Sequence, residues 1–203
     1  MPAKNQDLHG NVPDSSPVVL ILIDVINAFE FEGAEPILKN TLVIASSIHT
    51  LKKRAKQAGV PVIYVNDNFG KWQSDFRKLL AHCLEEGVKG KPVAELLKPD
   101  DDDYFVLKPK HSGFYSTTLD VLLDYLQART LILAGVTANI CVLFTANDAY
   151  MRDYHLIVPR DCVASESDEV NRYALDQIAK VLKADTRVST EINFEAIGLR
   201  TED

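Results

Sequence analysis

The stretch VVLILID, residues 18–24, decides the fold class, because an uninterrupted apolar run ends there in an aspartate. The run shows neither the polar alternation of a half-exposed strand nor the spacing of an amphipathic helix. It is typical of a strand in a parallel sheet that helices cover on both faces. Four further runs share this short, apolar character, and they lie at residues 62–66, 104–107, 130–134 and 155–158. A sixth strand is predicted near residues 186–189.

Helical patterns separate these runs. Apolar residues recur at helical spacing over 44–58, 119–126 and 170–181, and Gly59 and Pro61 end the first of these patterns. An alternation of strands and helices implies parallel strands that right-handed crossovers connect. The sequence therefore predicts an α/β fold, a three-layer doubly wound sandwich with a mainly parallel six-stranded sheet.

The size and composition of the chain suit one globular domain. It has 203 residues, of which 46% are hydrophobic and 25% are charged, and a chain of this length can bury a substantial core. Residues 1–17 are polar and contain Pro13 and Pro17, so they are predicted to form a flexible leader before a single domain at 18–203. The formal net charge is −7 and the Lys and Arg residues are scattered, so nucleic acid is not an expected partner.

The cysteine pattern indicates a reducing compartment. Cys83, Cys141 and Cys162 are widely spaced, and none has the spacing of a zinc-ligand pair. Free thiols are typical of cytoplasmic proteins. The apolar run at 18–23 is too short to cross a membrane. The expected location is therefore the cytoplasm, with no membrane partner.

Three reactive side chains follow directly after predicted strands. Asp24 ends the first strand, Lys108 ends the third, and Cys141 follows the fourth in LILAGVTANIC, residues 131–141. In doubly wound sheets, ligands bind beyond the carboxyl ends of the strands. Each of these residues alone is also compatible with a structural role, but together they place a carboxylate, an ammonium group and a thiol at one edge of the sheet.

This combination suits covalent catalysis by a thiol. The pKa of a thiol falls beside a cation and at a helix N-terminus, and Lys108 and a helix capped by Asn139 would supply both effects. Asp24 could accept the thiol proton and later give it to a leaving amine. The sequence therefore predicts an unusually acidic Cys141 within an Asp24–Lys108–Cys141 catalytic triad.

Four segments resemble the isochorismatase-like cysteine hydrolases, which include nicotinamidases, N-carbamoylsarcosine amidohydrolases and ureidoacrylate amidohydrolases. LILIDVINAF is similar to the segment that contains the family's catalytic Asp, and VLKPKHSGFYSTTLDVLL to the segment that contains its catalytic Lys. AGVTANICVLFTANDAYMRDY resembles the nucleophile segment, and VPRDCVAS resembles the segment that closes the fifth strand. The resemblance extends from about residue 18 to about residue 189, and it places the catalytic residues on Asp24, Lys108 and Cys141.

The resemblance implies further features of the site. The Val136–Thr137 peptide bond should be cis, and the backbone amides of Thr137 and Cys141 should form an oxyanion hole. Asp161, in the segment VPRDCVAS, should be structural. The family also implies a homo-oligomer, either a dimer or a tetramer, in which a neighbouring subunit often completes the pocket.

The expectations for metal and pocket depend on the segment VNDNFGKWQSDF, residues 65–76. Zinc-binding relatives carry an Asp-x-His and a further His after the second strand, whereas this segment has Asp67 and no His. The sequence therefore predicts no bound metal and no other cofactor. The acidic run at 100–103 is interpreted as a solvated loop rather than a metal site. The residues expected to line the substrate pocket are Phe29, Asn66, Asp67, Trp72 and Phe114.

The predicted activity is hydrolysis of a small amide or carbamoyl-type C–N bond through a Cys thioester intermediate, with a small molecule as substrate. Isochorismatase-type hydrolysis of a vinyl ether is an alternative, although family members with that activity generally lack the nucleophilic cysteine. A third interpretation is a non-catalytic domain that binds small molecules or senses redox state.

Overall fold

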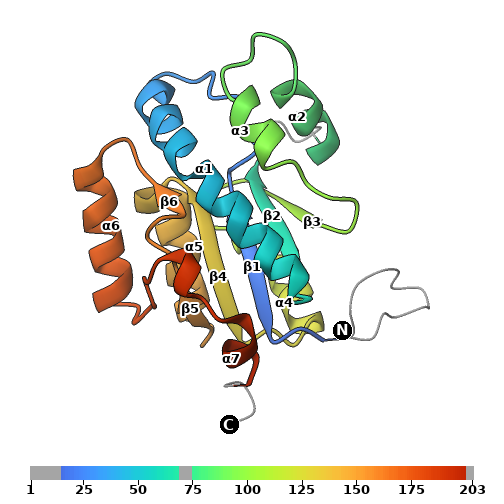
Figure 1. Ribbon diagram of the computed structural model, residues 1–203, viewed down its shortest axis with the longest axis vertical. Coiled ribbons are helices and arrows are strands. Elements are labelled where there is room, and N and C mark those ends of the chain that lie inside the picture. The colour runs from blue at the N-terminus through green and yellow to red at the C-terminus, as the bar shows by residue number, and fades with distance from the viewer. Residues whose placement is uncertain (1–14, 69–74, 200–203) are drawn as a thin grey trace.

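The structure is a computed structural model that describes residues 15–68 and 75–199. Its centre is a six-stranded sheet with the order β3-β2-β1-β4-β5, in which β6 also pairs with β4 (Figure 1). All the strand pairs are parallel. The strands are β1 (Val18–Ile23), β2 (Val62–Asp67), β3 (Tyr104–Lys108), β4 (Thr130–Val136), β5 (His155–Ile157) and β6 (Val163–Ala164). This arrangement confirms the predicted fold class.

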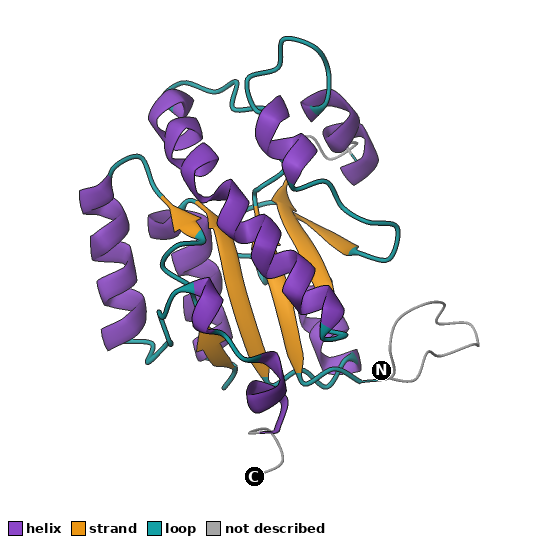
Figure 2. Cartoon of the chain, in the orientation of Figure 1, coloured by secondary structure: helices purple, strands orange, loops and turns teal. Residues whose placement is uncertain are grey.

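Helices cover both faces of the sheet, as Figure 2 shows. The helices are α1 (Ala34–Gln57), α2 (Phe76–Cys83), α3 (Lys91–Leu96), α4 (Leu119–Tyr125), α5 (Leu143–Tyr150), α6 (Asp168–Lys180) and α7 (Phe194–Leu199). One-turn helices η1 (Ala138–Val142) and η2 (Ser189–Glu191) complete the described elements. Apolar residues of α1, α2, α3 and α7 pack on one face, and those of η1, α4, α5 and α6 pack on the other.

The residues of β1 explain why the chain forms two apolar cores. Leu20 and Leu22 face the core under α1, whereas Ile21 and Ile23 face the core under α4 and α5. Side chains alternate between the faces of a strand, so a strand that is covered on both sides must be apolar throughout. All six residues of β1 are buried, and the uninterrupted apolar run in the sequence is the signature of that burial.

The sixth strand lies elsewhere than predicted. Near residues 186–189 no strand is present, and only Asp185 pairs with Ile157 as an isolated bridge. Asp161 accepts hydrogen bonds of 2.7 Å from both the amide and the hydroxyl of Ser189, and the Asp185 carboxylate accepts one of 3.0 Å from the amide of Arg187. Side chains thus satisfy backbone donors that a strand would need for its ladder. The prediction was wrong, and β6 is the sixth strand.

The last residues of the predicted leader at 1–17 make contacts with the domain. Residues 1–14 lie outside the described residues, but Ser16 and Pro17 already belong to the fold. The Ser16 amide donates to the carbonyl of Leu126 at 2.6 Å, and the Pro17 carbonyl accepts from the amides of Arg129 and Thr130, each at 2.9 Å. Contacts with the rest of the domain therefore begin before β1.

The acidic run at 100–103 packs against lysines of α1. We call the group formed by Lys52, Lys56, Asp100, Asp102 and Asp103 the α1 charge cluster. Lys52 Nζ lies 2.6 Å from Asp103 Oδ2, and Lys56 Nζ lies 2.9 Å from Asp103 Oδ1 and also contacts Asp102. Because both lysines form ion pairs with carboxylates of this run, the cluster connects α1 to the loop before β3.

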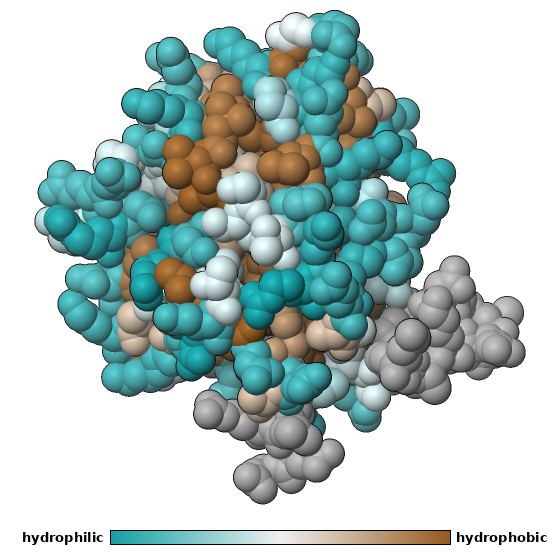
Figure 3. Space-filling view, viewed as in Figure 1, coloured by the Kyte–Doolittle hydropathy of each residue, from teal (hydrophilic) through white to brown (hydrophobic). Residues whose placement is uncertain are grey.

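Apolar side chains also reach the surface of the face that α1 covers, as the brown patches in Figure 3 show. Leu42 and Val43 of α1 and Leu96 of α3 are exposed. Among the helices of residues 15–68 and 75–199, none is long and apolar enough to span a bilayer.

Candidate active site

Asp24 lies where β1 ends and the chain turns with a positive φ of 52°. Its backbone amide still donates to the Val65 carbonyl at 3.0 Å. Its carboxylate turns towards β2, where Oδ1 accepts a 2.7 Å hydrogen bond from the amide of Asp67. A positive φ is uncommon for a non-glycine residue and persists where the surroundings hold it in place. The carboxylate is therefore fixed at the carboxyl end of the sheet.

Lys108 ends β3 and pairs in register with Asp67 of β2. Its side chain is fully buried, and its Nζ lies 2.9 Å from Asp24 Oδ2 and 3.4 Å from Asp67 Oδ2. The same atom lies 3.5 Å from Cys141 Sγ. A buried ammonium group is tolerated where carboxylates compensate its lost hydration, so Lys108 joins both aspartates to the thiol.

Cys141 lies in η1, a single turn of π-helix that continues into α5. The residue is partly exposed, and its thiol lies close enough to the Asp24 carboxylate to affect the pKa of that group. The prediction that Asn139 caps this helix was wrong, because Thr137 occupies the N-cap position. Asn139 lies inside η1, where its Oδ1 accepts a 2.9 Å hydrogen bond from the hydroxyl of Ser165. Isolated π-turns occur frequently at functional sites.

The loop before Cys141 lies next to Asp24 and Cys141, at the same pocket. The Val136–Thr137 peptide bond is cis. The Thr137 carbonyl accepts from the amides of Ile140 at 3.2 Å and Val142 at 3.1 Å, the residues on either side of Cys141. Thr137 and Cys141 both line the pocket described below. Their amides are therefore the candidate donors for an oxyanion.

Gly135 sets the distance between the two strands that carry this site. It pairs in register with Ile23, the residue before Asp24, and has a φ of 124°. A Cβ atom at this position would lie 2.0 Å from the Ile23 carbonyl oxygen. Only glycine fits such a close approach at this φ, so the close packing of β1 and β4 depends on it.

The protonation of the triad differs from the prediction. Burial raises the pKa of Asp24 above its ordinary value of 3.8, despite the opposing effects of Lys108 and of the Cys141 side chain. Burial also raises the pKa of the Cys141 thiol; the charge of Asp24 raises it further, and Lys108 lowers it. The unusually acidic thiol was therefore a wrong prediction for the free site, because burial and a nearby carboxylate outweigh the single cation. The pKa of Lys108 is raised, since Asp24, Cys141 and Asp67 outweigh its burial.

The triad opens onto a pocket of about 340 Å³ at the carboxyl ends of β1, β2 and β4. Lys108 lies behind the wall that Asp24 and Cys141 form. The described residues that line this pocket are Asp24, Asn27, Phe31, Ile37, Asp67, His111, Val136, Thr137, Ile140 and Cys141.

Of the residues expected to line the pocket beside the triad, Asp67 does so. Phe29 and Phe114 are 1% and 5% exposed and belong to the two apolar cores. Asn66 is 1% exposed, and its amide donates to the Ile26 carbonyl at 2.8 Å. The structure therefore places these three residues in the interior, not on the pocket wall. Trp72 lies outside the described residues.

Six lining residues were missed from the sequence: Asn27, Phe31, Ile37, His111, Val136 and Ile140. Two of them carried a usable signal, because Ile140 immediately precedes the nucleophile candidate and His111 lies in the same short segment as Lys108. Ile37 lies in the first turn of α1, which begins well before the helical pattern that the sequence revealed. Phe31 carried no signal that spacing could have detected.

The loop that follows Asp24 is held by contacts from two other segments. Asn66 of β2 donates to the Ile26 carbonyl, and the amide of Gly90 donates to the Ala28 carbonyl at 3.1 Å. A Cβ atom at Gly90 would lie 1.8 Å from a carbonyl oxygen of this loop. The pocket wall next to Asp24 is therefore packed backbone against backbone.

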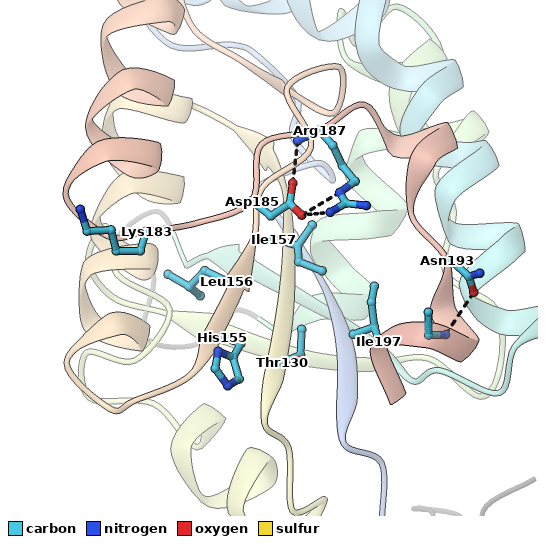
Figure 4. A pocket seen from close by; sticks show the side chains of 10 residues that line it. Thr130, His155, Leu156, Ile157, Lys183, Asp185, Arg187, Asn193 and Ile197 are labelled. Atoms are coloured by element: carbon cyan, nitrogen blue, oxygen red, sulfur yellow. Dashed lines mark hydrogen bonds and ion pairs between the residues drawn. The ribbon is translucent and has the colours of Figure 1, made fainter. Parts of the chain in front are cut away.

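A larger pocket, of about 470 Å³, lies at the opposite end of the sheet (Figure 4). Thr130 and His155, the first residues of β4 and β5, help to line it. Its Arg187 guanidinium turns to Asp185, with an Nε–Oδ2 distance of 2.7 Å. These charges compensate each other, and the described lining includes no member of the triad. The smaller pocket, where reactive groups converge, is therefore the candidate active site.

Comparisons with known proteins agree with this geometry. A family model, the isochorismatase domain, matches residues 18–189. The chain is 46% identical to the isochorismatase family protein YaaI of Bacillus subtilis, over 85% of this chain and 94% of YaaI. It is 32% identical to the isochorismatase of Bacillus subtilis, over 83% of this chain and 54% of that protein. The chain belongs to the isochorismatase family.

A solved structure supports the same assignment. The N-carbamoylsarcosine amidase from Thermoplasma acidophilum matches with a TM-score of 0.68 at 28% identity, and the match covers 88% of this chain and 99% of that one. The resemblance recognised in the sequence is thereby confirmed at the level of the family and of the fold.

Proposed function

We propose that this protein is a cysteine hydrolase that cleaves a small amide or carbamoyl-type C–N bond through a thioester on Cys141. One observation carries the proposal: Lys108 Nζ lies 2.9 Å from Asp24 Oδ2 and 3.5 Å from Cys141 Sγ, behind the wall of a pocket. A carboxylate, a cation and a thiol at these distances can move a proton and create a nucleophile. The amidase among the structural relatives supports a C–N bond as the target.

The first half of the reaction forms the thioester. Asp24 takes the proton of the Cys141 thiol as Sγ attacks the carbonyl carbon of the substrate. The raised pKa of Asp24 makes it a better proton acceptor than an ordinary carboxylate. Asp24 then gives this proton to the leaving nitrogen, the C–N bond breaks, and ammonia or an amine departs.

The second half releases the acid. A water molecule attacks the thioester carbonyl while Asp24 accepts a proton from it. The C–S bond breaks, the carboxylic acid leaves, and the thiolate regains the proton from Asp24. In both halves negative charge develops on the carbonyl oxygen, and the amides of Thr137 and Cys141 are the donors that would stabilise it.

Lys108 acts without exchanging a proton. Its pKa is raised by Asp24, Cys141 and Asp67 against the effect of burial, so it stays charged through the cycle. Its charge lowers the pKa of the Cys141 thiol and holds the Asp24 carboxylate in place. Because the thiol is protonated in the free site, the thiolate forms as the substrate binds and the proton moves to Asp24.

The similarity to the isochorismatase of Bacillus subtilis supports a second candidate, hydrolysis of a vinyl ether. That reaction needs a proton donor such as Asp24 but no thiol nucleophile. The contact between Lys108 and Cys141 Sγ favours the thioester mechanism, because a cation beside the sulfur stabilises a thiolate, which hydrolysis of a vinyl ether does not need.

One experiment separates these candidates. Purified protein is incubated with small amides, ureides and carbamoyl compounds, and ammonia release is measured for wild type, Cys141→Ala and Cys162→Ala. Cys141→Ala should lower kcat/KM by at least about 10³-fold, whereas the buried Cys162 should be dispensable. Acid-quenched wild type should carry an acyl adduct on the peptide that contains Cys141. Near-normal turnover by Cys141→Ala would exclude covalent catalysis through this thiol, and no ammonia release from any of these compounds by wild type would favour the vinyl-ether reaction.

Two expectations from the sequence stay predictions. Activity should survive treatment with a chelator, and stoichiometric zinc whose removal abolishes activity would contradict this. The chain should form a dimer or a tetramer, and light scattering that gives a single species at the monomer mass of 22.6 kDa would contradict that.

A further inference from the structure

One lysine is shared between two carboxylates in this site. Lys108 Nζ lies 2.9 Å from Asp24 Oδ2 and 3.4 Å from Asp67 Oδ2. Two negative charges and one positive charge leave this group with a net charge of −1 while the Cys141 thiol is protonated, and the net charge stays at −1 when the thiol proton moves to Asp24. The mechanism uses Asp24 and Lys108 but assigns no proton transfer to Asp67.

Asp67 is placed where a substrate would meet it. It lines the pocket, and its side chain is 28% exposed, whereas that of Asp24 is 8% exposed. Much of the remaining wall is apolar and includes Phe31, Ile37 and Ile140. A carboxylate of the substrate would lose water against this wall and face a negative charge of the protein.

We propose that Asp67 determines specificity by making the pocket reject substrates that carry a carboxylate, so that it accepts small uncharged amides and ureides. The inference rests on the proposed hydrolase function and deepens it. A negative charge in the site discriminates by repelling substrates that carry a carboxylate. It does not make the site bind uncharged substrates more tightly. Among the described lining residues, His111 alone could add a positive charge, and it is exposed.

The charge of the pocket can be measured without any turnover. Iodoacetamide is uncharged and iodoacetate carries a carboxylate, and both alkylate the same thiolate. The ratio of their rates at Cys141 therefore cancels the fraction of thiolate present. Relative to glutathione at the same pH, wild type should favour iodoacetamide by at least about fivefold, as a like charge within a few ångströms predicts.

Two variants test whether Asp67 causes this preference. Asp67→Asn should bring the rate ratio close to that of glutathione. Ile140→Lys adds a cation to the pocket wall while Asp24, Asp67 and Cys141 keep their side chains, so it should shift the ratio in the same direction, and Ile140→Gln is its uncharged control. A wild-type ratio equal to that of glutathione, or an unchanged ratio in Asp67→Asn and Ile140→Lys, would overturn the proposal.

A matched pair of substrates connects the charge to the reaction. Propionamide and succinamate share the reacting amide and differ by a carboxylate, and ammonia release reports both. Wild type should prefer propionamide in kcat/KM, and Asp67→Asn should reduce this preference. Equal kcat/KM of wild type for propionamide and succinamate would overturn the specificity proposal but not the proposed hydrolase function. If neither is hydrolysed, nor any other amide, the hydrolase function fails and the substrate class fails with it, while the alkylation ratio still reports the charge of the site.

Discussion

The active site and the α1 charge cluster each contain a buried lysine held by carboxylates, and yet they do different things. Lys108 and Lys52 have side chains that are 0% and 6% exposed. Lys108 Nζ lies 2.9 Å from Asp24, and Lys52 Nζ lies 2.6 Å from Asp103. Distance and burial therefore do not distinguish the Lys108–Asp24 pair from the Lys52–Asp103 pair.

The pKa directions of the carboxylates separate the two groups. In the α1 charge cluster, hydrogen bonds from Lys56 and Lys52 overcome the effect of burial and lower the pKa of Asp100, and Lys56 lowers that of Asp102. In the active site, burial overcomes the single lysine and raises the pKa of Asp24. A carboxylate with a lowered pKa holds its charge and clamps two segments together, whereas one with a raised pKa can accept a proton and return it.

The largest expected effect comes from replacing one aspartate by asparagine in each of the two groups. Asp24→Asn should lower kcat/KM by at least about 10³-fold, because the proton acceptor for Cys141 is gone. Asp103→Asn should leave kcat/KM within about twofold but lower the free energy of unfolding by about 3 kcal/mol, since it removes one partner of a buried pair. Ammonia release and urea unfolding measure the two quantities. A comparable loss of turnover in both variants would show that the two aspartates do not have different roles.

The pH dependence of activity should report the carboxylate of Asp24. Asp24 must be ionised to accept the thiol proton, so kcat/KM should fall as the pH drops through its native pKa. Because burial raises that pKa, the acid limb should lie above pH 3.8. A pH–rate profile of the wild type on the identified amide gives the limb directly. An acid limb at or below the ordinary carboxylate value would contradict the raised pKa.

Stability should depend on pH in opposite directions in the two groups. The native pKa of Asp24 is raised, so its contribution to stability is present below pH 3.8 and is lost as the pH rises through the native pKa. The native pKa of Asp102 is lowered, so its contribution is present above pH 3.8 and is lost as the pH falls through the native pKa.

Urea unfolding between about pH 3 and pH 7 tests these signs. The stability difference between wild type and Asp24→Asn should shrink with rising pH, and the difference between wild type and Asp102→Asn should grow. Slopes of the same sign for both variants would show that the two carboxylates do not differ in the way described.

The smallest expected effect belongs to the exposed part of the α1 charge cluster. The Asp102 side chain is 66% exposed, so water screens its contact with Lys56. Asp102→Asn should change the free energy of unfolding at neutral pH by no more than about 0.5 kcal/mol, with no change in kcat/KM. A loss as large as that of Asp103→Asn would mean that burial is not what makes the cluster stabilising.

The sequence predicted the centre of the sheet better than its edge. β1 was predicted with its observed bounds, because a strand covered on both faces leaves a clear apolar run. The sixth strand was misplaced because only two residues, Val163 and Ala164, form it. So short a strand has no periodicity to detect, and the hydrogen bonds that Ser189 donates to Asp161 depend on tertiary contacts.

Site residues at strand ends could be predicted from the sequence. Site residues whose position depends on loops, or on the direction of a side chain, could not. Asp24, Lys108 and Cys141 follow strands whose carboxyl ends share one edge, and the structure brings their side chains together. Asn66 and Asp67 are neighbours on β2, and consecutive side chains point to opposite faces, so one lines the pocket and the other is buried. Sequence spacing could not show which of the two faces opens to the pocket.

The missing side chain at Gly135 limits how this protein can be changed. Ile23 and Gly135 are the paired residues from which the chain runs on to Asp24 and to the Cys141 loop, and any Cβ at position 135 would collide with a backbone carbonyl. Redesign of substrate choice can therefore vary the pocket walls at Ile37 or Ile140, but it must keep Gly135, which sets the gap between the proposed proton acceptor and the proposed nucleophile. A library that varies Ile37 and Ile140 while keeping this glycine would retain the spacing of β1 and β4 in every member.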